Sequence, residues 1–216
     1  GHDLQRDGAG LDPQFGEGLG SIQACALRCK RIVDNLLSFS RKPADEVLDT
    51  LDIHDVVEEA LSIARLHPRA KQVTIRLDLA EGLPSVCGNA GLLDQVLVNL
   101  LQNAFQASAN GQEVVLRTRA GGEHVFIEVE DRGVGIPRDV LPRVFEPFFT
   151  TKPTGEGTGL GLFVCYGIAR EHGGDLNVTS REGAGATFTL QLPVEGAAID
   201  GPGTKEGDDD RQRDKG

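Results

Sequence analysis

Residues 131–162 read DRGVGIPRDVLPRVFEPFFTTKPTGEGTGLGL, in which two glycine-rich segments flank a hydrophobic one. Glycine-rich turns are costly to order, and they persist where the backbone must approach a ligand closely or where a loop must move. We therefore expect this stretch to form a ligand-binding loop, and its neighbours in the sequence indicate the fold that carries it.

Regular patterns surround this stretch on both sides. Strand-like alternation of apolar and polar residues occupies 73–79, 113–119, 124–130, 175–180 and 186–193. Helical spacing occupies about 54–66, 91–108 and 158–172. Residues 112–131 and the last two strands each predict a hairpin. Antiparallel hairpins mixed with three helices predict an α+β fold, a two-layer sandwich in which a mixed, largely antiparallel sheet of about five strands packs on three helices.

The composition limits the class of protein. The chain has 216 residues, enough for one compact domain with an appendage, and 39% of them are hydrophobic. The formal net charge of -11 disfavours general attraction to nucleic acid or acidic lipid, so an anionic ligand must be held by local groups. No apolar run reaches the roughly 18–20 residues of a membrane span. We expect no membrane contact and a reducing, cytoplasmic setting, in which the four cysteines are free thiols.

The two ends differ from the middle of the chain. Residues 1–17 lack periodicity, so they predict a linker or the remnant of a tag. Residues 18–43 carry a narrow apolar seam that stops at a proline, as expected for a long helix that needs partner helices. The mixed domain is expected to span 44–194, followed by a disordered acidic tail over 195–216.

Amide side chains recur along the helix predicted at 91–108. Asn99, Asn103 and Gln106 fall at i, i+4 and i+7, which places them on one face of that helix. Such a row is usually only solvated. Amide oxygens are nevertheless suitable ligands for Mg²⁺, which reaches proteins through few contacts plus substrate phosphates. The row therefore predicts a metal site if a phosphate ligand binds beside it.

Two glycine-rich segments supply further groups. Asp131 follows a strand and can accept a hydrogen bond from an exocyclic amine, while Gly133 and Gly135 allow the backbone to turn tightly around a flat ring. A polar β-turn is the simpler interpretation of that segment taken alone. The segment GEGTGLGL begins a helix, whose N–H groups and dipole form an anion site without a side-chain cation. Three separate elements in a fixed order are stronger evidence than one glycine-rich loop.

Together these motifs resemble the ATP-binding catalytic domain of sensor histidine kinases, within the GHKL superfamily that also includes gyrase-type, mismatch-repair and chaperone ATPases. NLLQNAFQA resembles the asparagine box, DRGVGI and GTGLGL the two glycine boxes, and FEPFFTTK the phenylalanine box. HGGDLNVTSREGAGATFTLQLP resembles the closing strands. The likeness covers about 45–194 and implies a Bergerat-type fold. RIVDNLLSFSRKP, in the preceding helix, resembles the second helix of the dimerisation and phosphoacceptor hairpin.

The resemblance implies roles for residues of the asparagine box and the first glycine box. Asp131 would bind the adenine amine, with Gly133 and Gly135 shaping its pocket. Asn103 would ligate Mg²⁺, and Asn99 would support the metal or the phosphates. ATP and Mg²⁺ are therefore the ligands that the resemblance predicts.

The same resemblance makes residues 150–158 the lid over the ATP, with Phe148 and Phe149 as its hydrophobic anchor. Lys152 is expected either to contact the terminal phosphate or to remain a solvated loop residue. Many relatives carry Lys or Arg where this chain has Gln106. The resemblance therefore does not imply that Gln106 contacts a phosphate. The remaining nucleotide contacts that it implies are Ile136, Thr151, Gly157, Thr158, Gly159, Leu160, Gly161 and Thr187.

The position four residues before Asn103 separates kinase from hydrolase. Hydrolases of the family carry a Glu there, which activates water as a general base, whereas this chain has Asn99. An amide cannot accept a proton from water at neutral pH, but phosphoryl transfer relies mainly on positioning and charge stabilisation. We therefore predict transfer of the γ-phosphoryl of Mg·ATP to a histidine. The alternatives are an ATPase or switch of the same fold, and a nucleotide-binding dimerisation scaffold without kinase activity.

None of the five histidines matches the acceptor motif of the family. His172 is expected to cap the end of a helix, and His54, His67 and His124 do not resemble an acceptor. His2 precedes an acid, but the glycines and proline after it are incompatible with a long helix. We expect the chain to begin after the acceptor helix. The expected partners are ATP and ADP, the histidine-bearing hairpin helix of a parent kinase, a response regulator receiver domain, and a second copy in a full-length homodimer, with no nucleic acid.

Overall fold

A computed structural model of the protein describes residues 48–153 and 157–196. The linker predicted at 1–17, the helix predicted at 18–43 and the tail from residue 197 onward lie outside the described residues. Within the described part of the chain, no helix is both long enough and apolar enough to cross a membrane.

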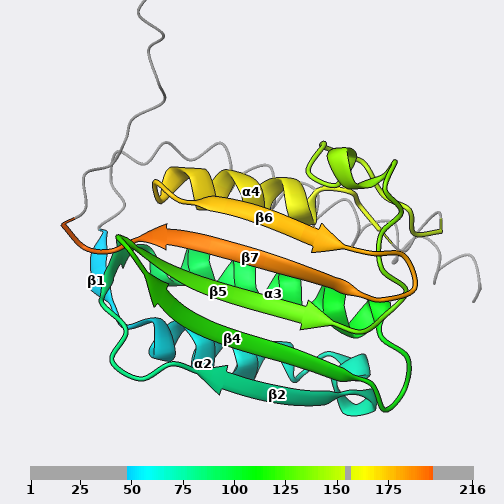
Figure 1. Ribbon diagram of the computed structural model, residues 1–216, viewed down its shortest axis with the longest axis horizontal. Coiled ribbons are helices and arrows are strands. Elements are labelled where there is room, and N and C mark those ends of the chain that lie inside the picture. The colour runs from blue at the N-terminus through cyan, green and yellow to red at the C-terminus, as the bar shows by residue number, and fades with distance from the viewer. Residues whose placement is uncertain (1–47, 154–156, 197–216) are drawn as a thin grey trace, which may run out of the picture.

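Five strands form one mixed sheet in the order β2-β4-β5-β7-β6 (Figure 1). Strand β2 is parallel to β4, and the other three neighbouring pairs are antiparallel. The pairs β4–β5 and β6–β7 are the two hairpins that the sequence predicts. The strands are β2 (Thr74–Leu79), β4 (Glu113–Gly121), β5 (His124–Asp131), β6 (Asp175–Ser180) and β7 (Ala186–Pro193).

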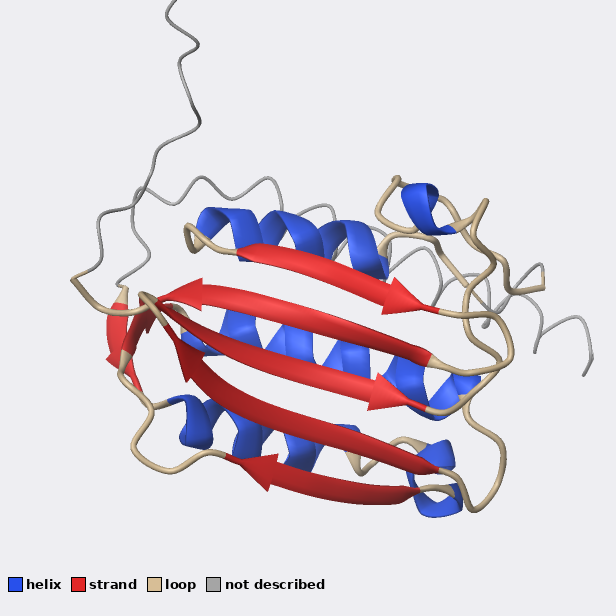
Figure 2. Ribbon diagram, viewed as in Figure 1, coloured by secondary structure: helices blue, strands red, loops and turns tan. Residues whose placement is uncertain are grey.

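Three helices cover one face of this sheet (Figure 2). They are α2 (Ile53–Ala64), α3 (Ala90–Ala107) and α4 (Gly161–Glu171). Helix α3 lies between the other two and packs against both of them (Figure 1). The predicted α+β two-layer sandwich of five strands on three helices is therefore confirmed.

The core lies between the two layers because the strands alternate. Along β5, Val125, Ile127 and Val129 are buried toward the helices. Their neighbour Glu130 is only partly buried and pairs with Arg117 of β4. The apolar face of α3 completes the core. Burial of this kind stabilises a fold by roughly 25 cal/mol per Å² of apolar surface. The packed sheet and α3 thus support the side chains that lie at the ends of β5 and α3.

Short elements are the part of the fold that the sequence patterns missed. Strands β1 (Asp49–Leu51) and β3 (Val86–Gly88) form a separate antiparallel pair, and each is too short to show alternation. Two 3-10 helices, η2 (Pro68–Gln72) and η3 (Leu141–Arg143), lie in connections between the longer elements. Helix α4 begins at Gly161 rather than near 158, because Gly159 has a φ of 67° and cannot belong to a right-handed helix.

His172 joins the ends of two helices. It is the C-cap residue of α4, and its side chain is buried. Its Nε2 accepts a hydrogen bond from the backbone N–H of Asn89 at 3.0 Å, so Nδ1 carries the proton and donates to Ile168 O at 2.8 Å. Asn89 itself caps α3 by accepting from Leu92 N at 3.1 Å. The predicted structural role of His172 is confirmed, and it fixes the start of α3 against the end of α4.

Candidate functional site

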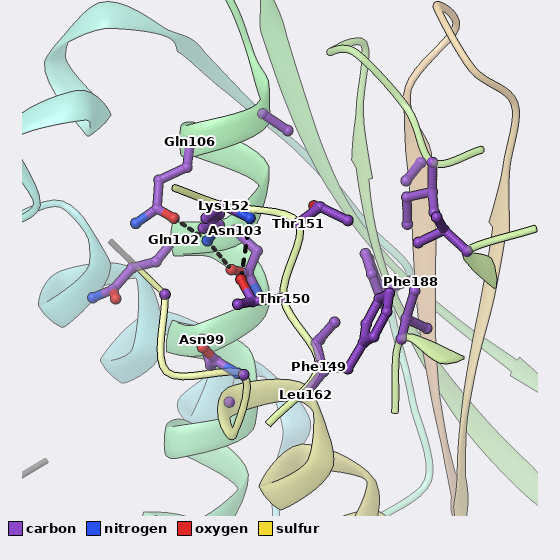
Figure 3. Close-up of a pocket in the computed structure, with 18 of the residues that line it drawn as sticks. Asn99, Gln102, Asn103, Gln106, Phe149, Thr150, Thr151, Lys152, Leu162 and Phe188 are labelled. Carbon is purple, nitrogen blue, oxygen red and sulfur yellow. Dashed lines mark hydrogen bonds between the residues drawn. The ribbon is translucent and has the colours of Figure 1, made fainter. Parts of the chain in front are cut away.

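A cavity of about 460 Å³ lies where α3, the start of α4, the ends of β5 and β7, and residues 149–152 meet. Amide side chains of α3 lie on one side of it, and Phe188 of β7 lies on the other (Figure 3). The cavity brings together most of the residues predicted to bind nucleotide. These are Asn99, Asn103, Asp131, Gly135, Ile136, Thr151, Lys152, Gly157, Thr158, Gly159 and Gly161.

The sheet side of the cavity centres on Asp131, the last residue of β5. Its side chain is buried, and Oδ1 accepts a hydrogen bond from Gly133 N at 2.8 Å. Burial raises the pKa of Asp131, while backbone hydrogen bonds from Gly133 and Ala186 act in the opposite direction. The backbone N–H groups hold this carboxylate in place, and it remains able to accept a hydrogen bond from an N–H group in the cavity.

The turn after Asp131 is fixed by close backbone contacts. Gly135 has a φ of 67°, and a Cβ built on it would lie 2.1 Å from the carbonyl oxygen of Arg181. A Cβ on Gly133 would lie 2.2 Å from the carbonyl oxygen of Ala107, at the end of α3. Gly133 thus packs the turn against α3 and lies outside the cavity lining, whereas Gly135 is part of that lining.

The opposite side of the cavity is formed by α3 and the segment that carries Lys152. The Lys152 ammonium donates a hydrogen bond to Asn103 Oδ1 at 3.1 Å and another to Gln106 Oε1 (Figure 3). The backbone N–H of Lys152 donates to Thr150 Oγ1 at 3.2 Å. The sequence left two expectations for Lys152, a phosphate contact or a solvated loop residue. Lys152 is partly buried, so it is not a solvated loop residue. It places a positive charge beside the predicted metal ligand.

The start of α4 closes the cavity beside Asn99. The N-cap residue is Leu160, which has no side-chain oxygen to accept from the first N–H groups of the helix. Gly161 lies against Asn99, because a Cβ on Gly161 would come within 2.8 Å of the Asn99 amide. The Asn99 Nδ2 donates to the Sγ of the buried Cys165 at 3.1 Å, and this bond fixes which way the amide points. Because Gly161, the first residue of α4, lines the cavity, the positive end of the α4 dipole faces it.

Three residues predicted to contact the nucleotide, Phe148, Leu160 and Thr187, lie outside the cavity lining. Phe148 has a φ of 65° and is 64% exposed, and the neighbouring Phe149 lines the cavity instead. Leu160 is 1% exposed and belongs to the core beneath the α4 N-terminus. Thr187 lies between Ala186 and Phe188 on β7, and because strand residues alternate between faces, those two line the cavity and Thr187 does not.

Several lining residues were not predicted from the sequence. Gln102 follows Asn99 by three positions and shares its helix face, so helical spacing could have indicated it. Strand alternation could have indicated Ala186 and Phe188 in place of Thr187. No pattern marks Val140 and Val144, because the stretch around η3 is irregular and its residues meet the cavity only through the tertiary fold.

The oxygen donors of the cavity fit a metal ion that is held mainly by the phosphates of a bound nucleotide and only partly by the protein. Within residues 48–153 and 157–196, no group of three or more His, Cys, Asp or Glu side chains is arranged to hold an ion. Asn103 Oδ1 already accepts a hydrogen bond from a cation, the Lys152 ammonium, so this oxygen is directed toward positive charge. Mg²⁺ commonly uses one or two protein oxygens together with substrate phosphates, and Asn103 with Asn99 beside it suits that arrangement.

An α+β sandwich with a buried acid on the sheet side of its cavity and amides, a lysine and a helix N-terminus on the other side is a nucleotide-binding domain of the ATPase type. The family of histidine kinase-, DNA gyrase B-, and HSP90-like ATPases matches residues 88–196, about half of the chain, and the chain belongs to this family.

Proteins similar to this chain are sensor histidine kinases. Sensor kinase CckA of Brucella abortus (strain 2308) is 39% identical over 199 residues, which cover 84% of this chain and 20% of that protein. Sensor histidine kinase ZraS of Escherichia coli (strain K12) is 38% identical over 167 residues, 77% of this chain and 35% of that protein. This chain thus spans a minor part of these relatives. The solved structure of a mycobacterial sensor histidine kinase, MprB, superposes with a TM-score of 0.61 at 27% identity, over 68% of this chain and 98% of that one.

Proposed function

We propose that this chain is the catalytic module of a sensor histidine kinase, which binds Mg·ATP in the cavity and transfers the γ-phosphoryl group to a histidine on a hairpin helix. The relatives support the kinase class, since they are sensor kinases. The observation that favours transfer over hydrolysis is that Asn99, an amide, lines the cavity at the sequence position where hydrolases of the family carry a glutamate.

The sheet side of the cavity would hold the adenine. Asp131 accepts a hydrogen bond from the exocyclic amine of the base, and Gly135 allows the backbone to pass close to the ring plane. Ile136, Leu162 and Phe188 offer apolar surface for the two faces of the ring. A buried carboxylate that requires an N–H partner favours adenine over a base that presents a carbonyl oxygen at that position.

The phosphates would then lie between α3 and the start of α4. Backbone at Gly157, Gly159 and Gly161 can approach them closely, and the α4 dipole favours their negative charge. Lys152 supplies a positive charge, and Asn103 supplies an oxygen for the metal. Mg²⁺ bound there would neutralise negative charge on the phosphates.

Asn99 makes hydrolysis slow in this arrangement. Among the described residues that line the cavity, Asp131 is the one carboxylate, and it belongs to the sheet side. The Asn99 Nδ2 is engaged by Cys165 Sγ, and an amide oxygen is too weak a base to take a proton from water. In transfer, an imidazole nitrogen forms the new P–N bond while the bond from the γ-phosphorus to the bridging oxygen breaks and ADP leaves.

The acceptor histidine is proposed to come from the hairpin of the parent kinase. The four described histidines, His54, His67, His124 and His172, all lie outside the cavity lining, and His172 has a structural role. A response regulator receiver domain would take the phosphoryl group next, and the full-length protein would act as a cytoplasmic homodimer or as the cytoplasmic part of a larger sensor.

The experiment is incubation with γ-labelled Mg·ATP, alone and with a protein that contains the hairpin of the parent kinase. We expect acid-labile, alkali-stable label on the hairpin and negligible release of labelled phosphate. Rapid phosphate release without labelling would show a hydrolase. ATP binding with neither transfer nor release would show a nucleotide-binding scaffold.

A further inference from the structure

Lys152 has an unusual place among the residues of the cavity. Of the described residues that line it, Lys152 is the one with a basic side chain, although a nucleoside triphosphate carries several negative charges. The chain as a whole has a formal net charge of -11, so it offers no general attraction for such a ligand. Lys152 is therefore the side chain of this lining that can add a positive charge to the backbone groups and the helix dipole proposed to hold the phosphates.

Two amide oxygens of α3 hold the Lys152 ammonium over the cavity. Asn103 Oδ1 accepts from it at 3.1 Å, and Gln106 Oε1 accepts a second hydrogen bond (Figure 3). These residues are three positions apart on α3, so they form a pair of acceptors on one face of a rigid helix. The lysine reaches them from a segment that is 46 and 49 residues away in the sequence. These two bonds direct a long, flexible side chain toward α3.

The two acceptors differ in what else they must do. Asn103 is the residue that we propose as the metal ligand, so its oxygen cannot serve Lys152 and a metal equally. Gln106 lies one turn further along α3, and its oxygen, which accepts from Lys152, is not the one that we propose as the metal ligand. Each acceptor that holds the ammonium reduces the rotamer freedom of a long lysine side chain, and that freedom opposes any contact with a phosphate.

We propose that Gln106 is a positioning residue that keeps the Lys152 ammonium at the terminal phosphate, and that this pair makes the site prefer ATP to ADP. The inference rests on the proposed function, because it requires that the cavity binds Mg·ATP. Gln106 acts through Lys152 and needs no contact with the nucleotide. ADP lacks the γ-phosphate, so its binding depends little on where Lys152 is held.

The test is a double-mutant cycle on the full chain, with the dissociation constants of Mg·ATP and Mg·ADP measured by titration calorimetry. Lys152→Ala should weaken ATP about tenfold, the size of one charge-assisted contact, and change ADP by less than about twofold. Gln106→Ala should weaken ATP roughly three- to tenfold and spare ADP in the same way. In the Lys152→Ala background, Gln106→Ala should have no further effect on ATP.

Two further variants complete the design. Gln95→Ala removes another glutamine of α3 that lies outside the cavity lining, and it should leave both dissociation constants unchanged. Gln106→Lys combined with Lys152→Ala moves the ammonium from the loop to the helix, and it should recover most of the ATP affinity. If the ATP affinity recovers when the charge is moved to position 106, then a substitution at this position does not weaken ATP by damaging the fold.

The outcomes separate this inference from the proposed function. Additive losses in the double variant, or equal losses for ATP and ADP, would overturn the role of Gln106 while leaving the nucleotide site intact. A wild-type chain that binds no Mg·ATP would overturn both. ATP-specific, non-additive losses with recovery by Gln106→Lys would support the inference.

Discussion

The two sides of the cavity are built by different means. On the sheet side, the Asp131 turn is held by backbone: glycines pack against carbonyl groups, and backbone N–H groups bind the carboxylate. On the other side, Lys152 is held by side-chain amides of α3 and by the Thr150 hydroxyl. Backbone contacts leave few alternative arrangements, whereas side-chain bonds can exchange partners. We infer that the sheet side is preformed for the base and that the Lys152 side adjusts to the phosphates.

The largest expected effect comes from the preformed side. Asp131→Asn keeps an oxygen that can accept from Gly133, but it replaces a pure acceptor by a group that is both donor and acceptor. We expect the affinity for ATP to fall roughly 10- to 100-fold, as for the loss of a hydrogen bond to a charged group. Titration calorimetry checks this. Glu130→Gln, the neighbour on the other face of β5, is the control, and equal losses in both variants would contradict the assignment.

The same carboxylate predicts a pH dependence. Burial raises the pKa of Asp131, so its ionised form is lost at a higher pH than for an ordinary aspartate as the solution is acidified. A protonated carboxyl is a poorer acceptor, and the affinity for ATP should decrease as the pH falls through this raised pKa. The Asp131→Asn variant lacks this titration. The difference in affinity between wild type and variant should therefore shrink on acidification, and a constant difference would show that Asp131 does not titrate in this way.

Gly159 tests the loop that joins the two sides. Its φ is 67°, and a Cβ there would lie 2.3 Å from the carbonyl carbon of Phe148, so Gly159→Ala must displace the backbone near Lys152. We expect ATP affinity to fall about tenfold. Gly122→Ala is matched in conformation, with a φ of 60°, but its Cβ meets open space. The left-handed conformation should cost each variant about 1–2 kcal/mol of stability, the backbone clash should cost Gly159→Ala more, and only Gly159→Ala should lose affinity.

Asn103 should show its role through the metal. Asn103→Ala removes an oxygen ligand, and we expect about a tenfold loss of ATP affinity in Mg²⁺ and a smaller loss in EDTA, where the variant lacks only one of the two α3 acceptors of Lys152. Titrations with and without the chelator provide the comparison within each variant. Equal losses under the two conditions would mean that Asn103 holds the nucleotide without holding a metal.

Cys165 carries the smallest expected effect. Burial raises its pKa to about 12, so the thiol stays neutral, accepts from Asn99 Nδ2 and lies 3.9 Å from Val96 O. Cys165→Ala frees the Asn99 amide to rotate, and we expect about a threefold loss of ATP affinity. Cys165→Ser, which keeps a donor and an acceptor, should lose less. A larger loss for serine than for alanine would exclude a role for this hydrogen bond.

The sequence was informative wherever a regular pattern or a fixed motif was present. Alternation located all five strands of the main sheet, and helical spacing placed the α3 amides on one face. Asp131 and the glycine-rich segments were found as motifs, and they meet in one cavity. These features depend on local geometry, which the order of residues determines directly.

Other features depend on how the chain packs, and the sequence did not indicate them. Neighbouring residues of a strand point to opposite faces of the sheet. Ala186 and Phe188 therefore line the cavity, and Thr187, which lies between them, does not. The left-handed backbone at Phe148 turns that ring outward and leaves Phe149 inside. The contact of Lys152 with Gln106 joins residues 46 apart in the sequence, and nothing in either local segment predicts it.

The most direct test of the account is a comparison of Mg·ATP with Mg·GTP on the wild-type chain by titration calorimetry. The central claim is that Asp131 reads the base by accepting from an amine, and guanine presents a carbonyl oxygen at that position. We predict that ATP binds at least about 100-fold more tightly than GTP, because a carboxylate facing a carbonyl oxygen would be left without a donor. Equal affinities for the two nucleotides would contradict the claim.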